Sequence, residues 1–329
     1  MTFDISRRGL LGGAAALAAT VALPHRARAA TIFRYGNAGG PQTVSNTFNL
    51  AFSNAMKDKT GGEISFEIFA GTLGGEKDLI ESMALGSLDI YNGAYTGIEE
   101  FDILYSPYFF KNAVQAKKVM ESEIGAKCSA ALTERYDAKL LGVGRLGSYN
   151  LMLKDPITSL DDLKGRKIRA PQIKGCIEAL SHFGAIPTPI PFNEVYLSLQ
   201  SGIVDGVLTA LNPAVQFKFY EVCKYVVVPD FGLALDKEVI SNAAWNSMTP
   251  EQQEIMQSTF DALETTDYYE VGVKAKKTDF KAWSDANGPE ALIDLDASGL
   301  IAAMEPVNKK LADEAFGPGA WDMINAIEG

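Results

Sequence analysis

The stretch Leu160–Phe192 reads LDDLKGRKIRAPQIKGCIEALSHFGAIPTPIPF, and it decides the fold. Its centre is Arg169, which lies in the strand-like run Lys167–Ala170 and is followed by Pro171, a residue that cannot continue a sheet ladder. In open α/β sheets, ligands bind where strands give way to loops. A guanidinium there offers a planar fork of donors that fits a carboxylate, whereas the alternative is a surface ion pair.

The N-terminal residues 1–29 predict an export signal. The pair Arg7-Arg8 precedes an apolar, Ala-rich run that ends at Leu23, and residues 27–29 supply the small side chains of a cleavage site. The paired arginines resemble a twin-arginine signal, so we expect export to the periplasm and a mature start near Ala30. A membrane anchor is the alternative, but the run is shorter than the roughly 20 residues that a spanning helix needs.

The mature chain is strongly acidic. Without residues 1–29, Lys+Arg fall from 30 to 26 and Asp+Glu from 41 to 40, so the formal net charge moves from -11 to -14. Such a surface argues against nucleic acid or an anionic membrane as a partner. A mature chain of about 300 residues predicts two lobes rather than one core.

Cysteine and histidine usage limits the chemistry. The three cysteines, Cys128, Cys176 and Cys223, match no metal or redox spacing, and we expect three buried free thiols. A Cys176–Cys223 disulfide is the alternative. His182 is the one histidine left after cleavage, and we expect it to be a packed or surface residue. The sequence therefore predicts no metal site, no cofactor and no enzyme activity, because a nucleophile–base pair is also missing.

Apolar periodicity predicts alternating strands and helices. Strands are expected at 31–35, 63–69, 87–91, 139–143, 149–154 and 225–228, and helices at 43–59, 76–85, 112–136, 250–283 and 300–312. The helix from 250 begins with a capping box at Thr249-Pro250-Glu251-Gln252 and would be roughly 45 Å long, which exceeds one lobe. Trp321 is expected to pack the C-terminal tail against the body of the protein.

One helix-to-strand corner occurs twice. Residues 80–90 (IESMALGSLDI) and 196–206 (YLSLQSGIVDG) each combine an apolar-periodic helix, a glycine suited to a left-handed cap, a two-residue turn, an aspartate and a strand. The repeat predicts two similar α/β lobes. Because the shared string is short, chance resemblance is the alternative.

The motifs along the chain resemble those of substrate-binding proteins of TRAP (tripartite ATP-independent periplasmic) transporters. The similar segments follow one another in the order of the family: LGG at 73–75, GSLD at 86–89, LKGRKIRAP at 163–171, GAIPTP at 184–189, FNEVY at 192–196, GIVDG at 202–206 and KFYEV at 218–222. The resemblance covers essentially the whole mature chain.

This resemblance implies a two-lobed α/β periplasmic-binding-protein fold with hinge-crossing strands and a long helix that spans both lobes. We expect the N-terminal lobe to comprise residues 30–146 and 235–274, and the C-terminal lobe residues 147–234 and 275–329. The family mostly captures organic acids in the cleft and delivers them to an integral-membrane permease. A binding protein of an ATP-driven importer or of a sensor system is the alternative.

The resemblance also assigns site residues. Arg169 matches the arginine that pairs with the ligand carboxylate, and Phe192 the aromatic residue that packs on the ligand. Asn37 matches a first-strand loop asparagine that reaches the cleft, and Tyr95 and Thr96 lie on a loop that lines it.

Two departures from the family pattern bear on the ligand. Where many members have an asparagine that helps to hold the carboxylate, this chain has Thr209, with Asn212 one turn further as the alternative. Where sialic-acid-binding members have a second arginine, this chain has Tyr149, beside Asn150. Sialic acid is therefore disfavoured, and we expect a smaller or partly apolar monocarboxylate.

Overall fold

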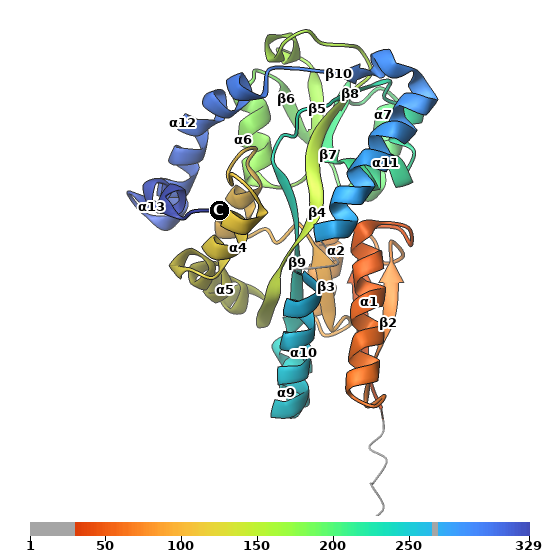
Figure 1. The fold of residues 1–329 in the computed structure, drawn as a ribbon, viewed down its shortest axis with the longest axis vertical. Coiled ribbons are helices and arrows are strands. Elements are labelled where there is room, and N and C mark those ends of the chain that lie inside the picture. The colour runs from red at the N-terminus through yellow and green to blue at the C-terminus, as the bar shows by residue number, and fades with distance from the viewer. Residues whose placement is uncertain (1–29, 265–268) are drawn as a thin grey trace, which may run out of the picture.

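The computed structural model describes residues 30–264 and 269–329, so the predicted export signal lies outside them. Ten strands form one mixed sheet through the middle of the protein, with the order β2-β1-β3-β9-β4-β7-β5-β6, while β8 pairs with β4 and β10 with β8 (Figure 1). The strands are β1 (Thr31–Asn37), β2 (Ile64–Ala70), β3 (Ile90–Gly93), β4 (Ala138–Leu153), β5 (Lys167–Ala170), β6 (Ile186–Pro189), β7 (Gly206–Ala210), β8 (Tyr225–Val227), β9 (Leu233–Ser241) and β10 (Leu292–Ile293).

Helices cover the sheet on both sides. They are α1 (Val44–Lys59), α2 (Glu76–Ala84), α3 (Glu99–Asp102), α4 (Ala113–Met120), α5 (Glu123–Tyr136), α6 (Lys174–His182), α7 (Val195–Gln200), α8 (Leu211–Gln216), α9 (Asn242–Ser247), α10 (Pro250–Leu263), α11 (Tyr269–Asn287), α12 (Ala297–Phe316) and α13 (Ala320–Ala326). Short 3-10 turns cover residues 103–105, 160–163, 192–194, 219–221 and 289–291.

The sheet has two halves that share their longest strands. β4 pairs with β9 from Ala138 to Ser148 and with β7 from Tyr149 onward, and Figure 1 shows β4 and β9 running through the centre of the molecule. The order β2-β1-β3-β9 on one side is repeated as β6-β5-β7-β4 on the other. The fold is therefore the expected two-lobed α/β architecture with strands that cross between the lobes.

The predicted repeat has the same geometry in both halves. Gly86 and Gly202, which follow α2 and α7, have φ angles of 77° and 78°, values that suit glycine because other side chains rarely adopt them. Each aspartate carboxylate then accepts the N–H of a residue on the neighbouring parallel strand. These bonds are 2.7 Å from Arg34 N to Asp89 Oδ2 and 2.8 Å from Lys167 N to Asp205 Oδ2.

Two element predictions were wrong. The helix expected over 112–136 is interrupted, because Ser122 caps a new helix by accepting the N–H of Ile124 at 3.2 Å. A side chain at Gly125 would also lie 1.8 Å from the carbonyl oxygen of Met120. The strands expected at 139–143 and 149–154 are one continuous strand, β4, since pairing with β9 carries it through the intervening glycines.

The helical prediction over 250–283 is confirmed for the two helices α10 and α11. The second of them, α11, ends at Asn287, four residues beyond Trp283. The capping box at Thr249 is present, with 3.2 Å between Gln252 N and Thr249 Oγ1. α10 packs on α1, whereas α11 packs on α8 and β4, so the two helices serve different halves of the sheet. Residues 265–268, between them, lie outside the described part of the chain.

Remaining details of the core agree with the sequence. All three cysteines are buried and free, and His182 lies exposed at the surface. Trp321 is buried against Phe109, with ring centroids 5.4 Å apart, and so fixes the tail to the first half of the chain. No helix among residues 30–264 and 269–329 is long and apolar enough to cross a membrane.

Candidate functional site

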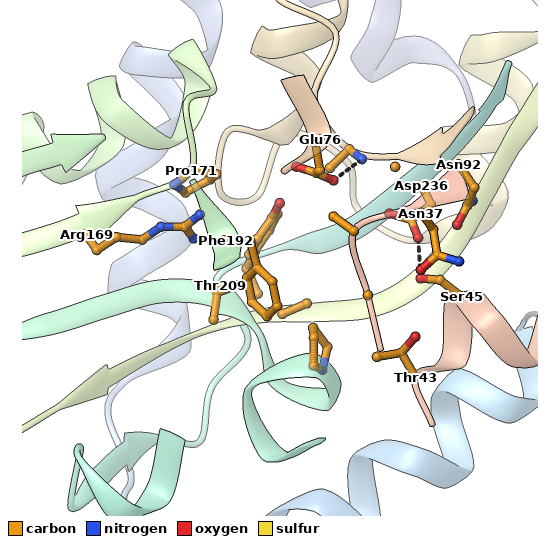
Figure 2. A pocket seen from close by; sticks show the side chains of 17 residues that line it. Asn37, Thr43, Ser45, Glu76, Asn92, Arg169, Pro171, Phe192, Thr209 and Asp236 are labelled. Carbon is orange, nitrogen blue, oxygen red and sulfur yellow. Dashed lines mark hydrogen bonds between the residues drawn. The ribbon is translucent and has the colours of Figure 1, made fainter. Parts of the chain in front are cut away.

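A cavity lies where the two halves of the sheet face each other, at the ends of their central strands. It offers water-sized molecules about 60 Å³, and one water needs about 10–15 Å³ on this scale. Figure 2 shows Arg169, Pro171 and Thr209 on one side and Asn37, Ser45, Asn92 and Asp236 on the other. The full lining is Asn37, Ala38, Gly39, Thr43, Ser45, Glu76, Asn92, Gly93, Ala94, Tyr149, Arg169, Pro171, Phe192, Thr209, Ala210, Pro213 and Asp236.

Arg169 is the buried cation of this cavity. Its side chain is 3% exposed, and strand β5 directs it toward the opposing half. Nε donates to the carbonyl of Ile190 at 2.9 Å, and Nη1 donates to the carbonyl of Leu208 at 3.3 Å. Burial lowers the pKa of Arg169 to about 10, so the guanidinium stays charged at neutral pH. No carboxylate of residues 30–264 and 269–329 forms an ion pair with it.

Aromatic rings form the walls around the guanidinium. Phe192 contacts Phe217 edge-on, with ring centroids 5.1 Å apart. This contact with the residue after α8 fixes the position of the Phe192 ring. Tyr149 packs edge-on against Tyr105 at 6.4 Å, and burial raises the pKa of Tyr149 well above its usual range. The neutral phenol can therefore donate or accept a hydrogen bond. Thr209 adds a hydroxyl from β7 to this wall.

The rest of the cavity is polar and acidic. Glu76 is the first residue of α2, and its Oε1 accepts the N–H of Ala94 at 2.7 Å. Asp236, on β9, accepts a hydrogen bond from Ser45 Oγ at Oδ2, over 2.6 Å. Asn37 is 1% exposed, and neither its Oδ1 nor its Nδ2 has a hydrogen-bond partner within the described chain. These groups mostly accept hydrogen bonds, whereas the Arg169 end donates them.

A second set of charges lies behind this wall. Because side chains alternate along β9, Lys237 points away from the cavity, and its ammonium donates to the carbonyl of Ala94 and, at 2.5 Å, to Tyr105 Oη. Burial lowers the pKa of Lys237 and raises that of the neighbouring Asp102. Glu238 shares the face of β9 with Asp236 and accepts a hydrogen bond from the cavity residue Asn92, and burial holds its pKa well above its usual range, which favours the neutral acid. Lys237 thus supplies positive charge behind an acidic wall.

Five of the predicted site residues meet in this cavity: Arg169, Tyr149, Phe192, Thr209 and Asn37. Tyr95 lines an adjoining groove of about 240 Å³ that shares Arg169, Glu76 and Phe192 with the main cavity.

The other three predicted site residues lie outside both lining sets. The amide of Asn150 donates to the carbonyl of Val227 at 3.0 Å, on the face of β4 turned away from the cavity. Thr96 is buried beside Asp102, 3.3 Å from its Oδ1. The amide of Asn212 joins α1 to α11 through Val44 and Asp279. Each of these three side chains therefore forms a hydrogen bond within the fold and does not line the cavity.

Sequence reasoning missed the acidic end of the cavity. Glu76 follows Gly74-Gly75 at a helix start, in a segment that belongs to the family resemblance but for which the resemblance assigns no ligand contact. Asp236, Lys237 and Glu238 are three charged residues in succession inside the apolar run of β9, and all three are at most 4% exposed. Consecutive charges within a buried strand are a sequence signal for an internal site, because buried charges need partners.

The chain matches the family model described as "Bacterial extracellular solute-binding protein, family 7" over residues 36–315. It belongs to this family, the solute-binding proteins of TRAP transporters. Proteins of this family are periplasmic, and they are substrate-binding components of transporters rather than enzymes. Residues 30–264 and 269–329 contain no group of three or more His, Cys, Asp or Glu that could hold a metal ion.

Relatives of this solute-binding protein are named for acidic ligands. The sialic acid-binding periplasmic protein SiaP of Vibrio cholerae is 24% identical over 287 residues, which cover 86% of this chain and 88% of its own. The 2,3-diketo-L-gulonate-binding periplasmic protein YiaO of Escherichia coli is 25% identical, with coverages of 91% and 92%. A TRAP solute-binding protein of Pseudomonas putida F1 with bound D-glucuronate is 21% identical and shares the fold, with a TM-score of 0.81 and coverages of 91% and 98%.

Proposed function

We propose that this protein captures a small monocarboxylate in the cleft between its lobes through Arg169 and delivers it to the membrane permease of a TRAP transporter. The observation that carries the proposal is the buried guanidinium, which forms no ion pair in the described chain. A buried charge is costly unless it is paired, so the site favours an anion. Two of its five N–H donors bond to carbonyls, which leaves donors for a carboxylate.

Three relatives support this ligand class. The names or titles of SiaP, YiaO and the P. putida protein give sialic acid, 2,3-diketo-L-gulonate and D-glucuronate, and each of these ligands carries one carboxylate. The present cavity has room for about four to six waters, which supports a small acid. Tyr149, Thr209 and Phe192 would surround the bound carboxylate, and Asn37 would reach the ligand from the other half.

Binding would close the two lobes on the ligand. We propose boundaries at 146/147, 234/235 and 274/275. In support, β4 changes its partner from β9 to β7 between Ser148 and Tyr149, and β9 begins at Leu233. Closure excludes water and lowers the local dielectric, which strengthens the pairing between Arg169 and a carboxylate. The permease would recognise the closed form with its ligand bound. Export by the twin-arginine route would bring the protein to the periplasm, where it can meet the permease.

A ligand screen with two arginine variants tests the proposal. The purified mature protein is heated with a library of organic acids, because a ligand that binds only the folded state raises its stability by about 2.7 kcal/mol at 100-fold excess over Kd. Acids that raise the melting temperature are then titrated calorimetrically into wild type, Arg169→Met and Arg166→Met. Arg166 is the matched control, since its guanidinium donates to the carbonyls of Asp155 and Pro156 on the surface.

We expect Arg169→Met to weaken acid binding by more than about 100-fold and Arg166→Met to leave it unchanged. Charge-assisted hydrogen bonds contribute about 1.5–3 kcal/mol each, and a tenfold change in Kd corresponds to about 1.4 kcal/mol. If Arg169→Met still bound its acid with the affinity of wild type, the proposed role of the arginine would be wrong.

A further inference from the structure

We propose that Asp236, held in place by Ser45, selects ligands that present a hydrogen-bond donor, either hydroxyl or ammonium, at the end remote from the carboxylate. The inference rests on the function proposed above and adds a specificity-determining residue that carboxylate capture does not require. It concerns the wall of the cavity that faces Arg169, where Asp236 lies together with Asn37, Ser45 and Asn92 (Figure 2).

The cavity has two electrostatically different ends. Arg169 provides the cation on one side and Asp236 a carboxylate on the other, while Glu76 lies between them and also lines the groove at Arg169. A second carboxylate on the ligand would meet like charge at Asp236, and like charges at short range in a poorly solvated site repel strongly. A methyl or methylene group would remove water from the two carboxylates and return no hydrogen bond. Only a hydrogen-bond donor on the ligand both avoids repulsion by the carboxylates and replaces the hydrogen bonds of the water that it displaces.

The orientation of Asp236 is fixed from two sides. Its main chain belongs to β9, between the paired strands β3 and β4, and its Oδ2 accepts the hydroxyl of Ser45 at 2.6 Å. Ser45 is the second residue of α1, so this bond joins the start of a long helix to a central strand. Asp236 is 4% exposed, so its carboxylate is already largely withdrawn from solvent. A carboxylate held in this way discriminates by geometry, because it cannot turn to follow an ill-fitting ligand.

An independent observation indicates a polar ligand at this end. The Asn37 side chain is 1% exposed and lines the cavity, yet its Oδ1 and Nδ2 both lack a hydrogen-bond partner among the described residues. Buried amides are nearly always hydrogen-bonded. A hydroxyl can accept from Nδ2 and also donate to a carboxylate, whereas an apolar chain can do neither.

Because of Lys237, the hydrogen-bond donor on the ligand does not need a positive charge, and a neutral hydroxyl is enough to bind Asp236. Its ammonium donates to the Ala94 carbonyl and to Tyr105 Oη behind the wall, and although burial lowers the pKa of Lys237, the charges of Asp102, Glu76 and Asp236 oppose that shift. The carboxylates of the wall are thus partly compensated before a ligand arrives. An ammonium on the ligand is a second way of donating to Asp236, and the experiment includes both donors.

The test compares straight-chain carboxylic acids of four to six carbons in four forms: the unsubstituted, polyhydroxylated and ω-amino monocarboxylates, and the α,ω-dicarboxylate. Calorimetric Kd values are measured with the full mature protein as wild type, Asp236→Ala, Asp236→Asn, Ser45→Ala and Arg169→Met. Asp236→Asn keeps the size of the side chain and an acceptor for Ser45, so it should stay folded even if Asp236→Ala does not. The melting temperature of each ligand-free variant confirms the folded state.

We expect wild type to bind at least one donor-bearing form about 10-fold or more tightly than the unsubstituted acid, and the dicarboxylate least tightly. Asp236→Ala should remove this preference: the donor-bearing acids should lose affinity, whereas the unsubstituted acid should bind equally well or more tightly because it no longer desolvates a carboxylate. Asp236→Asn should improve dicarboxylate binding, because it removes the like charge, and Ser45→Ala should weaken the preference partially. A purely structural role for Asp236 would instead lower the affinity for all four forms together.

Two results would overturn the inference and leave the proposed function intact. One is equal affinity for the unsubstituted and donor-bearing acids in wild type, and the other is an equal loss for both in Asp236→Ala, with Arg169→Met abolishing binding in either case. Unchanged binding in Arg169→Met would instead reject the proposed function itself. Failure of every acid in the series to bind wild type would reject both.

Discussion

The side-chain oxygen Oδ1 of Asn212 accepts the main-chain N–H of Val44 at 3.0 Å, and this hydrogen bond joins the two halves of the protein. Val44 is the first residue of α1, where main-chain N–H groups have no partner within the helix. Asn212 belongs to α8 in the other half, and its Nδ2 donates to Asp279 Oδ2 on α11 at 3.1 Å. The predicted ligand contact is thus a bridge between the lobes.

Asn212→Ala is expected to weaken ligand binding by about 2- to 10-fold, although Asn212 lies outside the cavity. A hydrogen bond contributes about 0.5–1.5 kcal/mol net, and this one is available only when the lobes are together. Calorimetric Kd values measure the effect, and small-angle scattering should show a larger ligand-free radius. The control is Asn287→Ala, since Asn287 donates to the carbonyl of Tyr220 within one half. An equal loss of affinity in both variants would argue against a role in closure.

Arg169→Met should change the free energy of unfolding of the ligand-free protein by less than about 1 kcal/mol. The variant loses the hydrogen bonds to the Ile190 and Leu208 carbonyls, but it also removes a buried charge that forms no ion pair in the described chain. Urea unfolding monitored by circular dichroism measures the balance. A loss of about 3–5 kcal/mol, the range seen when a buried ion pair is broken, would mean that Arg169 serves the fold instead of the ligand.

The carboxyl of Asp279 should make stability fall as pH rises from about 4 to 6. Burial raises its pKa from 3.8 to about 6. Between these values the folded protein keeps a proton that the unfolded chain has released, so the folded state binds more protons and raising the pH favours unfolding. Urea midpoints of wild type and Asp279→Asn, measured from pH 4 to 8, isolate this contribution. The advantage of Asp279→Asn should grow up to about pH 6 and then level off; a constant difference would contradict the raised pKa.

Gly142→Ala should destabilise the protein by about 1–3 kcal/mol, the usual cost of overpacking a core. A Cβ atom on Gly142 would lie 2.1 Å from Cε1 of the buried Phe260 ring, where α10 packs against β4. Gly40→Ala is the control, because its nearest contact, the Phe217 ring, lies at 3.5 Å. Thermal unfolding of both variants compares them directly, and equal melting temperatures would mean that the ring moves aside freely.

Local sequence predicted most elements because their signals are local. Thr249 caps α10 where expected, α1 begins at Val44, one residue after its predicted start, and β5 occupies the predicted residues 167–170. One wrong prediction arose where a neighbouring strand decided the outcome, because β4 stays extended through its glycines by pairing with β9. The other overlooked a local signal, the Ser122 side chain that accepts the N–H of Ile124 and begins a new helix within 112–136.

The sequence by itself determined the family, the alternation of strands and helices, the twofold repeat and the position of Arg169 at a strand end. Tertiary structure alone decided which distant side chains meet that arginine across the cavity. Ser45 and Asp236 are 191 residues apart along the chain, yet they share a 2.6 Å hydrogen bond. No local pattern encodes such a pairing, because it depends on where the start of α1 and the strand β9 are placed when the chain folds.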